Sequence, residues 1–258
     1  MDFARGITAY GDPRNPALLF LHGIRLAGKI WEEHALALSD EFYVVTPDLP
    51  GHGALAELPF EIPVIDAFLA HIAATLTCGP PLVIGYSLGG YVAMRYATDL
   101  PEQTAGLLLA GCSTDIIGHR QMLYELSVKL SGQFTPAFLQ SALAVFLRLT
   151  LPRHVAETIV PFRFNQHVFR ASRKIVGGVR YSERLVTYSK PVLIVNGQWD
   201  VLFRPDEAKY ARSARAQIAI MNGATHIAPL SCPAQFIAIV RAFAREVLGG
   251  RGASGLLN

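Results

Sequence analysis

The chain has 258 residues, 51% of them hydrophobic, which is enough for one sizeable core. Its formal charge of +3 is too small to imply a nucleic-acid partner, and no apolar run of about 18 residues predicts a membrane span. The N-terminal residues lack a hydrophobic signal core, and the three cysteines have no paired or zinc-like spacing. We therefore expect a cytoplasmic protein with reduced thiols and no metal site.

Strand and helix patterns alternate along the first 112 residues. Short unbroken apolar runs are typical of parallel strands that are covered on both faces. The expected strands are residues 3–10, 17–21, 42–46, 82–84 and 107–110, and the expected helices are 31–38, 62–77 and the segment that follows residue 87. This alternation predicts an α/β fold, with a mostly parallel twisted sheet and helices on both faces.

The alternation stops between residues 113 and 189. Helical spacing fills this stretch, at residues 119–131, 135–149, 152–160 and 165–176, and strands and helices resume at 191–195, 206–214, 217–221 and 234–248. The stretch holds ten Lys or Arg against four Asp or Glu, so it is the basic part of the chain. We expect a core of residues 1–112 and 190–258, with residues 113–189 inserted as a helical lid.

A glycine-rich segment around Ser87 separates a predicted strand from a predicted helix. A serine held in a strained turn needs small neighbours two positions away on either side, and Gly85 and Gly89 meet that need. The turn would expose the serine hydroxyl above the sheet. It would also point the N–H of Leu88, at the start of the helix, toward the place where an oxyanion develops.

Three more chemically active groups follow predicted strands. They are the His22-Gly23 pair, Asp200 and His226. Because the carboxyl ends of parallel strands share one edge of a sheet, we expect these groups to gather around Ser87. Asp206 competes with Asp200 for the role of the acid, but it starts a predicted helix, where an acidic side chain favours the helix dipole.

With these residues the chain resembles the α/β-hydrolase fold superfamily, in its lid-bearing branch of small esterases and lactonases. The resemblance covers residues 17–248 and implies a nucleophile at Ser87, an acid at Asp200 and a base at His226. It also implies an oxyanion hole formed by the N–H groups of Ile24 and Leu88. The segment before residue 17 is short for the family's usual hairpin, so the sheet has either seven or eight strands.

The implied activity is that of a serine hydrolase that cleaves an ester, thioester or lactone through an acyl-enzyme and needs no cofactor. Relatives with the same triad also hydrolyse carbon–carbon bonds, act as lyases or transfer acyl groups, and these alternatives stay open. A non-catalytic ligand-binding protein on the same scaffold is a further alternative, because a fold does not fix a function.

Substrate-binding residues are harder to infer from the sequence. Tyr86 and Trp199 flank the predicted catalytic groups and are candidates for the pocket wall. The arginines of the basic insertion either lie on solvated faces or, at Arg163 and Arg170, contact an anionic substrate. A small-molecule substrate is expected, and neither a nucleic-acid nor a membrane partner; the sequence leaves the oligomeric state open.

Overall fold

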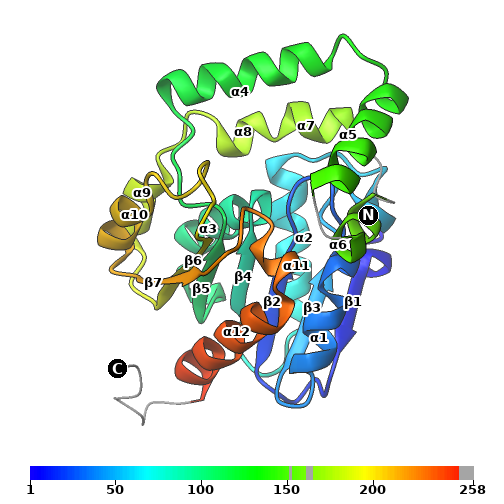
Figure 1. The fold of residues 1–258 in the computed structure, drawn as a ribbon. Helices are drawn as coiled ribbons and strands as arrows, with labels where there is room; N and C mark the ends of the chain where they lie inside the picture. Colours follow the sequence, from blue (N-terminus) through cyan, green and yellow to red (C-terminus); the bar gives the residue numbers. More distant parts are fainter. Residues whose placement is uncertain (151–152, 161–164, 250–258) are drawn as a thin grey trace.

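The computed structural model describes residues 1–150, 153–160 and 165–249; residues 151–152, 161–164 and 250–258 lie outside that description. Within the described residues, one seven-stranded sheet runs in the order β1-β3-β2-β4-β5-β6-β7 (Figure 1). The strands are β1 (Ile7–Tyr10), β2 (Ala17–Leu21), β3 (Tyr43–Pro47), β4 (Leu82–Tyr86), β5 (Gly106–Ala110), β6 (Val192–Gly197) and β7 (Gln217–Met221). Among these described strands only β1 is antiparallel to its neighbour, which confirms the predicted α/β class with the smaller of the two strand numbers.

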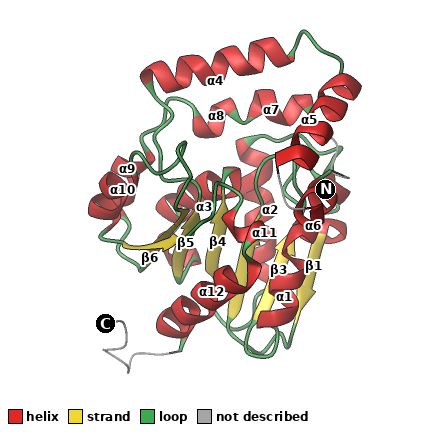
Figure 2. Ribbon diagram, in the orientation of Figure 1, coloured by secondary structure: helices red, strands yellow, loops and turns green. Residues whose placement is uncertain are grey.

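Both faces of the inner strands β2 to β6 are buried, as the unbroken apolar runs predict, whereas the edge strands β1 and β7 are partly exposed. On β2, Leu18 and Phe20 point into one core cluster and Leu19 and Leu21 into the other. The first cluster lies under α1 (Glu32–Leu38) and α12 (Pro233–Leu248), and the second under α2 (Ile62–Thr75), α3 (Leu88–Asp99) and α10 (Glu207–Ala214) (Figure 2). Each such side chain contributes about 1.5 to 3 kcal/mol by leaving water, so the strand ends rest on a well-anchored scaffold.

The predicted insertion consists of helices between β5 and β6. They are α4 (Gly118–Ser131), α5 (Pro136–Thr150), α6 (Arg153–Ile159), α7 (Gln166–Ala171), α8 (Arg173–Val176) and α9 (Tyr181–Arg184). Helices α4, α7 and α8 lie above the sheet at the top of the view (Figure 1). The helical pattern over residues 165–176 is interrupted at Ser172, whose hydroxyl bonds the Phe169 carbonyl and the Tyr124 hydroxyl. A lid function for these helices stays a prediction.

A buried carboxylate ties both ends of the insertion to the core. Asp115, just after β5, accepts hydrogen bonds from the N–H and hydroxyl of Ser182 on α9 at 3.1 and 2.6 Å. It also accepts from Tyr210 at 2.8 Å and from Lys209 at 2.7 Å, both on α10. Burial alone would raise the pKa of Asp115, but the hydrogen bonds from Lys209, Ser182 and Tyr210 outweigh it and lower that pKa.

The described helices include none that combines the length and the apolar character needed to cross a membrane. The same residues form no cluster of three or more side chains suited to holding a metal ion. Two short α-helices of the described chain are not predicted by the sequence pattern: α9 in the insertion, and α11 (Ala228–Ser231), which directly follows the loop of His226.

Candidate active site

Ser87 occupies a strained turn between β4 and α3. Its backbone has φ 51° and ψ −118°, a conformation that costs a non-glycine residue about 1 to 3 kcal/mol. The surrounding glycines are sterically required. A Cβ on Gly85 would lie 2.6 Å from the Cα of Gly90, and a Cβ on Gly89 would overlap the carbonyl oxygen of Leu21. Close packing of β2, β4 and α3 therefore holds the serine at the carboxyl edge of the sheet.

The structure brings Ser87 together with His226 and Asp200. His226 Nε2 lies 3.2 Å from Ser87 Oγ, and His226 Nδ1 lies 2.8 Å from Asp200 Oδ2. The other oxygen of Asp200 accepts the N–H groups of Leu202 and Phe203 at 3.3 and 3.2 Å, which fixes the orientation of this buried carboxylate. With Nδ1–H donated to Asp200, the lone pair of Nε2 faces the serine hydroxyl and can accept its proton.

Two aromatic rings hold the imidazole of His226 in place. Phe203 stacks on the imidazole, with the two ring centroids 4.5 Å apart. The ring centroid of Tyr86 lies 5.5 Å from that of His226. Tyr86 is buried, and burial raises the pKa of its hydroxyl, so this side chain stays neutral beside the site. Tyr86 lines the cavity at Ser87, as the sequence predicts, whereas Phe203 was not anticipated.

The turn after β2 is braced by a buried histidine. His22 Nδ1 donates to the carbonyl of Gly23 at 2.8 Å, and His22 Nε2 accepts the N–H of Leu49 at 2.9 Å. Burial lowers the pKa of His22 to about 4, so the ring is neutral and its tautomer is set by these partners. His22 thus fixes the backbone that carries the next residues toward Ser87.

The proposed oxyanion donors flank the serine. Gly23 lies so close to Ser87 that a Cβ on it would be 3.3 Å from the serine Cβ, and Ile24 lines the same cavity. Leu88 is the first residue of α3. In the part of the chain that the structure describes, neither the N–H of Ile24 nor that of Leu88 donates a hydrogen bond. Both groups are thus available to an oxygen that forms in this cavity.

The cavity at Ser87 has a volume of about 170 Å³ and a mostly apolar wall. The core contributes Leu26, Tyr86 and Ile227 to that wall, and the insertion contributes Leu143 and Leu147 from α5 and Ile159 from α6. Arg25 also lines the cavity. The sequence pattern did not single out Arg25 or the residues of α5 and α6.

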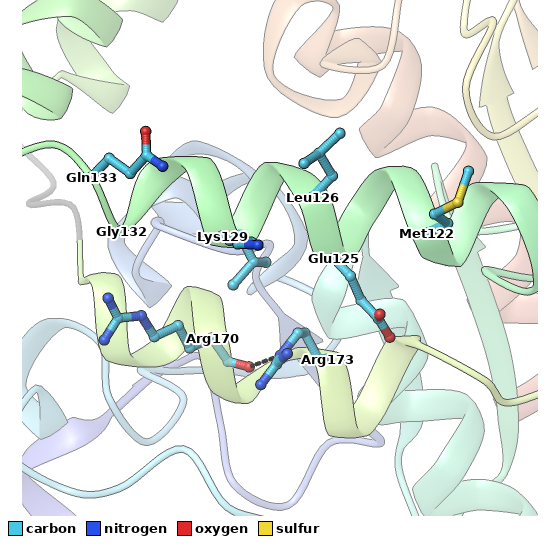
Figure 3. A pocket seen from close by; sticks show the side chains of 9 residues that line it. Met122, Glu125, Leu126, Lys129, Gly132, Gln133, Arg170 and Arg173 are labelled. Atoms are coloured by element: carbon cyan, nitrogen blue, oxygen red, sulfur yellow. Dashed lines mark hydrogen bonds between the residues drawn. The ribbon is translucent and has the colours of Figure 1, made fainter.

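Two of the residues predicted to bind substrate, Trp199 and Arg170, are not among the described residues that line this cavity. Trp199 is 60% exposed and is not among the lining residues that the structure describes. Arg170 lies in a separate open groove of about 720 Å³ between α4 and the α7–α8 segment, next to Arg173 and Lys129 (Figure 3). Arg163 falls outside the described residues. A substrate contact at any of the three stays a prediction.

Asp206, the competing acid, has other partners. It pairs with Arg120 of α4, and it accepts the N–H of Asp115 at 3.2 Å. The carboxylate that bonds the imidazole of His226 is Asp200. The geometry therefore favours Asp200 over Asp206 as the acid.

Comparisons with known proteins agree with this architecture. Residues 18–239 match the sequence profile described as "Alpha/beta hydrolase family". Lipase LipV of Mycobacterium tuberculosis is 39% identical over 119 residues, 44% of each chain. The pimeloyl-[acyl-carrier protein] methyl ester esterase of Nitrosomonas europaea is 26% identical over 244 residues, 86% of this chain and 93% of the relative.

Solved structures share the fold at low sequence identity. A thermophilic esterase from Thermogutta terrifontis superposes with a TM-score of 0.78 at 23% identity, covering 93% of both chains. MenH from S. aureus superposes with a TM-score of 0.79 at 21% identity, and the match covers 93% of this chain and 98% of the other. At these identities the likeness concerns the fold alone.

Proposed function

Because the chain belongs to the alpha/beta hydrolase family, we propose that it is a serine hydrolase that cleaves a carboxylic ester, thioester or lactone. The observation that carries the proposal is the hydrogen-bonded series Ser87–His226–Asp200, with distances of 3.2 and 2.8 Å. Serine is a weak nucleophile unless an adjacent base takes its proton, and this series supplies that base together with the group that orients it.

In the proposed reaction, Ser87 Oγ attacks the acyl carbonyl while His226 Nε2 takes the hydroxyl proton. The oxyanion of the tetrahedral intermediate accepts the N–H groups of Ile24 and Leu88, each worth on the order of 3 kcal/mol. The carbon–oxygen or carbon–sulfur bond of the substrate then breaks, and the leaving group receives the proton from His226. Water then attacks the acyl-enzyme in the same way, with His226 as the base. This step releases the carboxylic acid and free Ser87.

Asp200 acts through His226 in this scheme. Its carboxylate keeps the imidazole proton on Nδ1 and stabilises the imidazolium that forms during attack. The names of the sequence relatives support the choice of bond, since they include a lipase and a methyl ester esterase. An ester is therefore the first substrate class to examine.

The test is the Ser87→Ala variant, with p-nitrophenyl butyrate as substrate. We expect kcat to fall by a factor on the order of 10⁴ or more, because the nucleophile is lost while the fold is kept. A fluorophosphonate probe should label wild-type protein at Ser87 alone.

The matched control is Ser127→Ala, which removes an exposed hydroxyl on α4 and should leave both activity and labelling unchanged. A folded Ser87→Ala variant that retains wild-type turnover, or a probe adduct on another serine, would contradict the proposal.

A further inference from the structure

Helix α4 presents an apolar ridge to the solvent. The ridge consists of side chains that are between 46% and 64% exposed: Met122, Leu123, Leu126 and Leu130. Met122, Leu126 and Leu130 recur at every fourth residue, so they follow one side of the helix. A contiguous row of exposed aliphatic side chains marks a surface that another molecule covers.

The opposite side of α4 already has its packing partners. Val128 is buried, and the hydroxyl of Tyr124 lies 2.6 Å from the hydroxyl of Ser172, between α7 and α8. The ring of Tyr124 also contacts that of Phe169 on α7, at a centroid distance of 5.9 Å. The rest of the insertion therefore packs on the side of α4 that does not carry the ridge, and α4 lies above α7 and α8 in the view of Figure 1.

Basic side chains border the ridge. Those that line the open groove between α4 and the α7–α8 segment are Lys129, Arg170 and Arg173 (Figure 3). Glu125 is the only acidic side chain among the described residues of this groove, and it accepts a hydrogen bond from Gln121 at 2.9 Å. Within the described chain, no carboxylate lies within ion-pair distance of the three cations. Met122 and Leu126 line the same groove, so the ridge and the cations form one continuous surface.

The charge of these segments agrees with their surface. Residues 118–133 and 165–176 together contain five Lys or Arg and one Asp or Glu. An apolar side flanked by basic residues is typical of helices that lie in the interface of a membrane. The expectation of no membrane partner rested on the lack of a spanning segment, and a helix that lies on a membrane needs none.

We propose that this face of the insertion docks on an anionic lipid surface. The ridge enters the outer part of the acyl layer, and the three cations of the groove meet the phosphates of the headgroups. The inference concerns the place of the protein on a membrane and does not depend on the reaction at Ser87.

Two other occupants fit the surface less well. In a two-fold dimer of this chain the same patch would meet itself, so the cations of one copy would face those of the other. An acidic protein would match the cations. The ridge, however, holds only methionine and leucine, whereas the anchors of protein interfaces are mostly tryptophan, tyrosine and arginine.

The test is co-sedimentation of the full chain with lipid vesicles. Vesicles of equal parts phosphatidylglycerol and phosphatidylcholine are compared with vesicles of phosphatidylcholine alone. The partition coefficient should be at least about tenfold higher on the anionic vesicles, since each basic residue near such a surface contributes about fivefold. Raising NaCl from about 0.05 M to about 0.5 M should remove most of this difference, because salt screens the charges. No binding to anionic vesicles, or equal binding to both kinds, would overturn the inference.

Two double variants locate the contact on the molecule. Leu126→Gln/Leu130→Gln should weaken binding to anionic vesicles at least about tenfold, because the apolar area that enters the lipid is lost. Lys129→Gln/Arg173→Gln should weaken it about 30-fold, and should change binding to phosphatidylcholine vesicles less than about threefold. Wild-type binding by either double variant would contradict the proposed surface.

Matched controls change the same residue types elsewhere. Leu36→Gln on α1 and Arg212→Gln on α10 replace an exposed leucine and an exposed arginine, and both should bind as the wild type does. All variants should unfold within a few degrees of the wild type, so that lost binding reports the surface and not the fold. Ser87→Ala should also bind normally, which keeps this inference separate from the proposed function. Equal loss of binding in a control would overturn the inference.

The other occupants have outcomes of their own. Sedimentation equilibrium without lipid that shows a dimer for the wild type and a monomer for Leu126→Gln/Leu130→Gln would assign the ridge to a second copy. Binding of soluble polyglutamate without binding of anionic vesicles would assign the cations to an acidic polypeptide. Either result would overturn the lipid surface as the occupant.

Discussion

Replacing Asp200 by asparagine tests how the candidate site orients its base. The two oxygens of the carboxylate have different partners. Oδ1 accepts hydrogen bonds from the loop N–H groups of Leu202 and Phe203, and Oδ2 accepts one from Nδ1–H of His226. An asparagine in the same place would keep its oxygen on the two loop donors, because its amide nitrogen cannot accept them. That nitrogen would then face the Nδ1 atom of His226.

The imidazole must respond by changing its tautomer. With an amide N–H pointing at it, Nδ1 becomes the acceptor and the ring proton moves to Nε2, the atom that lies 3.2 Å from Ser87 Oγ. A protonated Nε2 cannot take the serine proton. In a serine protease the corresponding change costs about 10⁴ in kcat, which corresponds to about 5.4 kcal/mol. We expect a loss of that order here, with little change in KM.

The assay is steady-state hydrolysis of p-nitrophenyl butyrate, together with thermal unfolding. Because the amide introduced by Asp200→Asn would keep the loop contacts, the unfolding midpoint should move by only a few degrees. Asp206→Asn is the matched control, since this carboxylate pairs with Arg120 on α4 whereas His226 pairs with Asp200. A loss of less than tenfold at Asp200, or an equal loss at Asp206, would refute the assignment of the acid.

Two further predictions concern the scaffold. Gly89→Ala should lower the free energy of unfolding by about 1 to 3 kcal/mol in urea titrations, because the new Cβ meets the backbone oxygen of Leu21; an unchanged midpoint would show that β2 and α3 can separate. Asp115→Asn should lower the free energy of unfolding by about 1 to 3 kcal/mol. The asparagine carries no charge to pair with Lys209, and its amide N–H groups would face the donors of Ser182. Since the folded pKa of Asp115 is lowered, its contribution is full above the ordinary pKa of about 4 and is lost as the pH falls through the folded value. The difference in Tm between wild type and variant should therefore be constant from pH 8 to about pH 5 and shrink in more acidic solution; a constant difference at all pH values would contradict this.

The sequence predicted those parts of the site whose constraints are local. The Gly85–Gly89 segment could be interpreted because a serine in a strained turn dictates the size of its near neighbours, and the apolar run before it marks the end of a buried strand. Asp200 and His226 were placed by the rule that parallel strands end at one edge. The structure brings both side chains to Ser87.

The wall of the cavity could not be predicted in the same way. Helix α5 is apolar on more than one side, with Leu147 buried and Phe146 and Leu149 exposed, so its periodicity does not reveal which face meets the substrate. Trp199 shows a second limit of the sequence pattern: an aromatic neighbour of Asp200 suggests a pocket residue, but its side chain is largely exposed, and a substrate contact there stays a prediction. Both cases depend on where the inserted helices lie, which is tertiary information.

Polar residues that act over long separations were missed for a related reason. Asp115 bonds Ser182 and Tyr210, which are 67 and 95 residues away, and in the sequence each of them is an ordinary polar or aromatic residue. The positive φ of Arg25 is likewise invisible in the sequence, since arginine does not signal a left-handed turn.

The wall of the cavity has two origins in the chain. Leu143, Leu147 and Ile159 belong to the insertion, whereas Gly23 and Ile24 belong to the turn after β2. The insertion is joined to the core through the hydrogen bonds of Asp115. A shift of the inserted helices would therefore change the aliphatic side of the cavity and leave in place the turn that carries the proposed oxyanion donor Ile24.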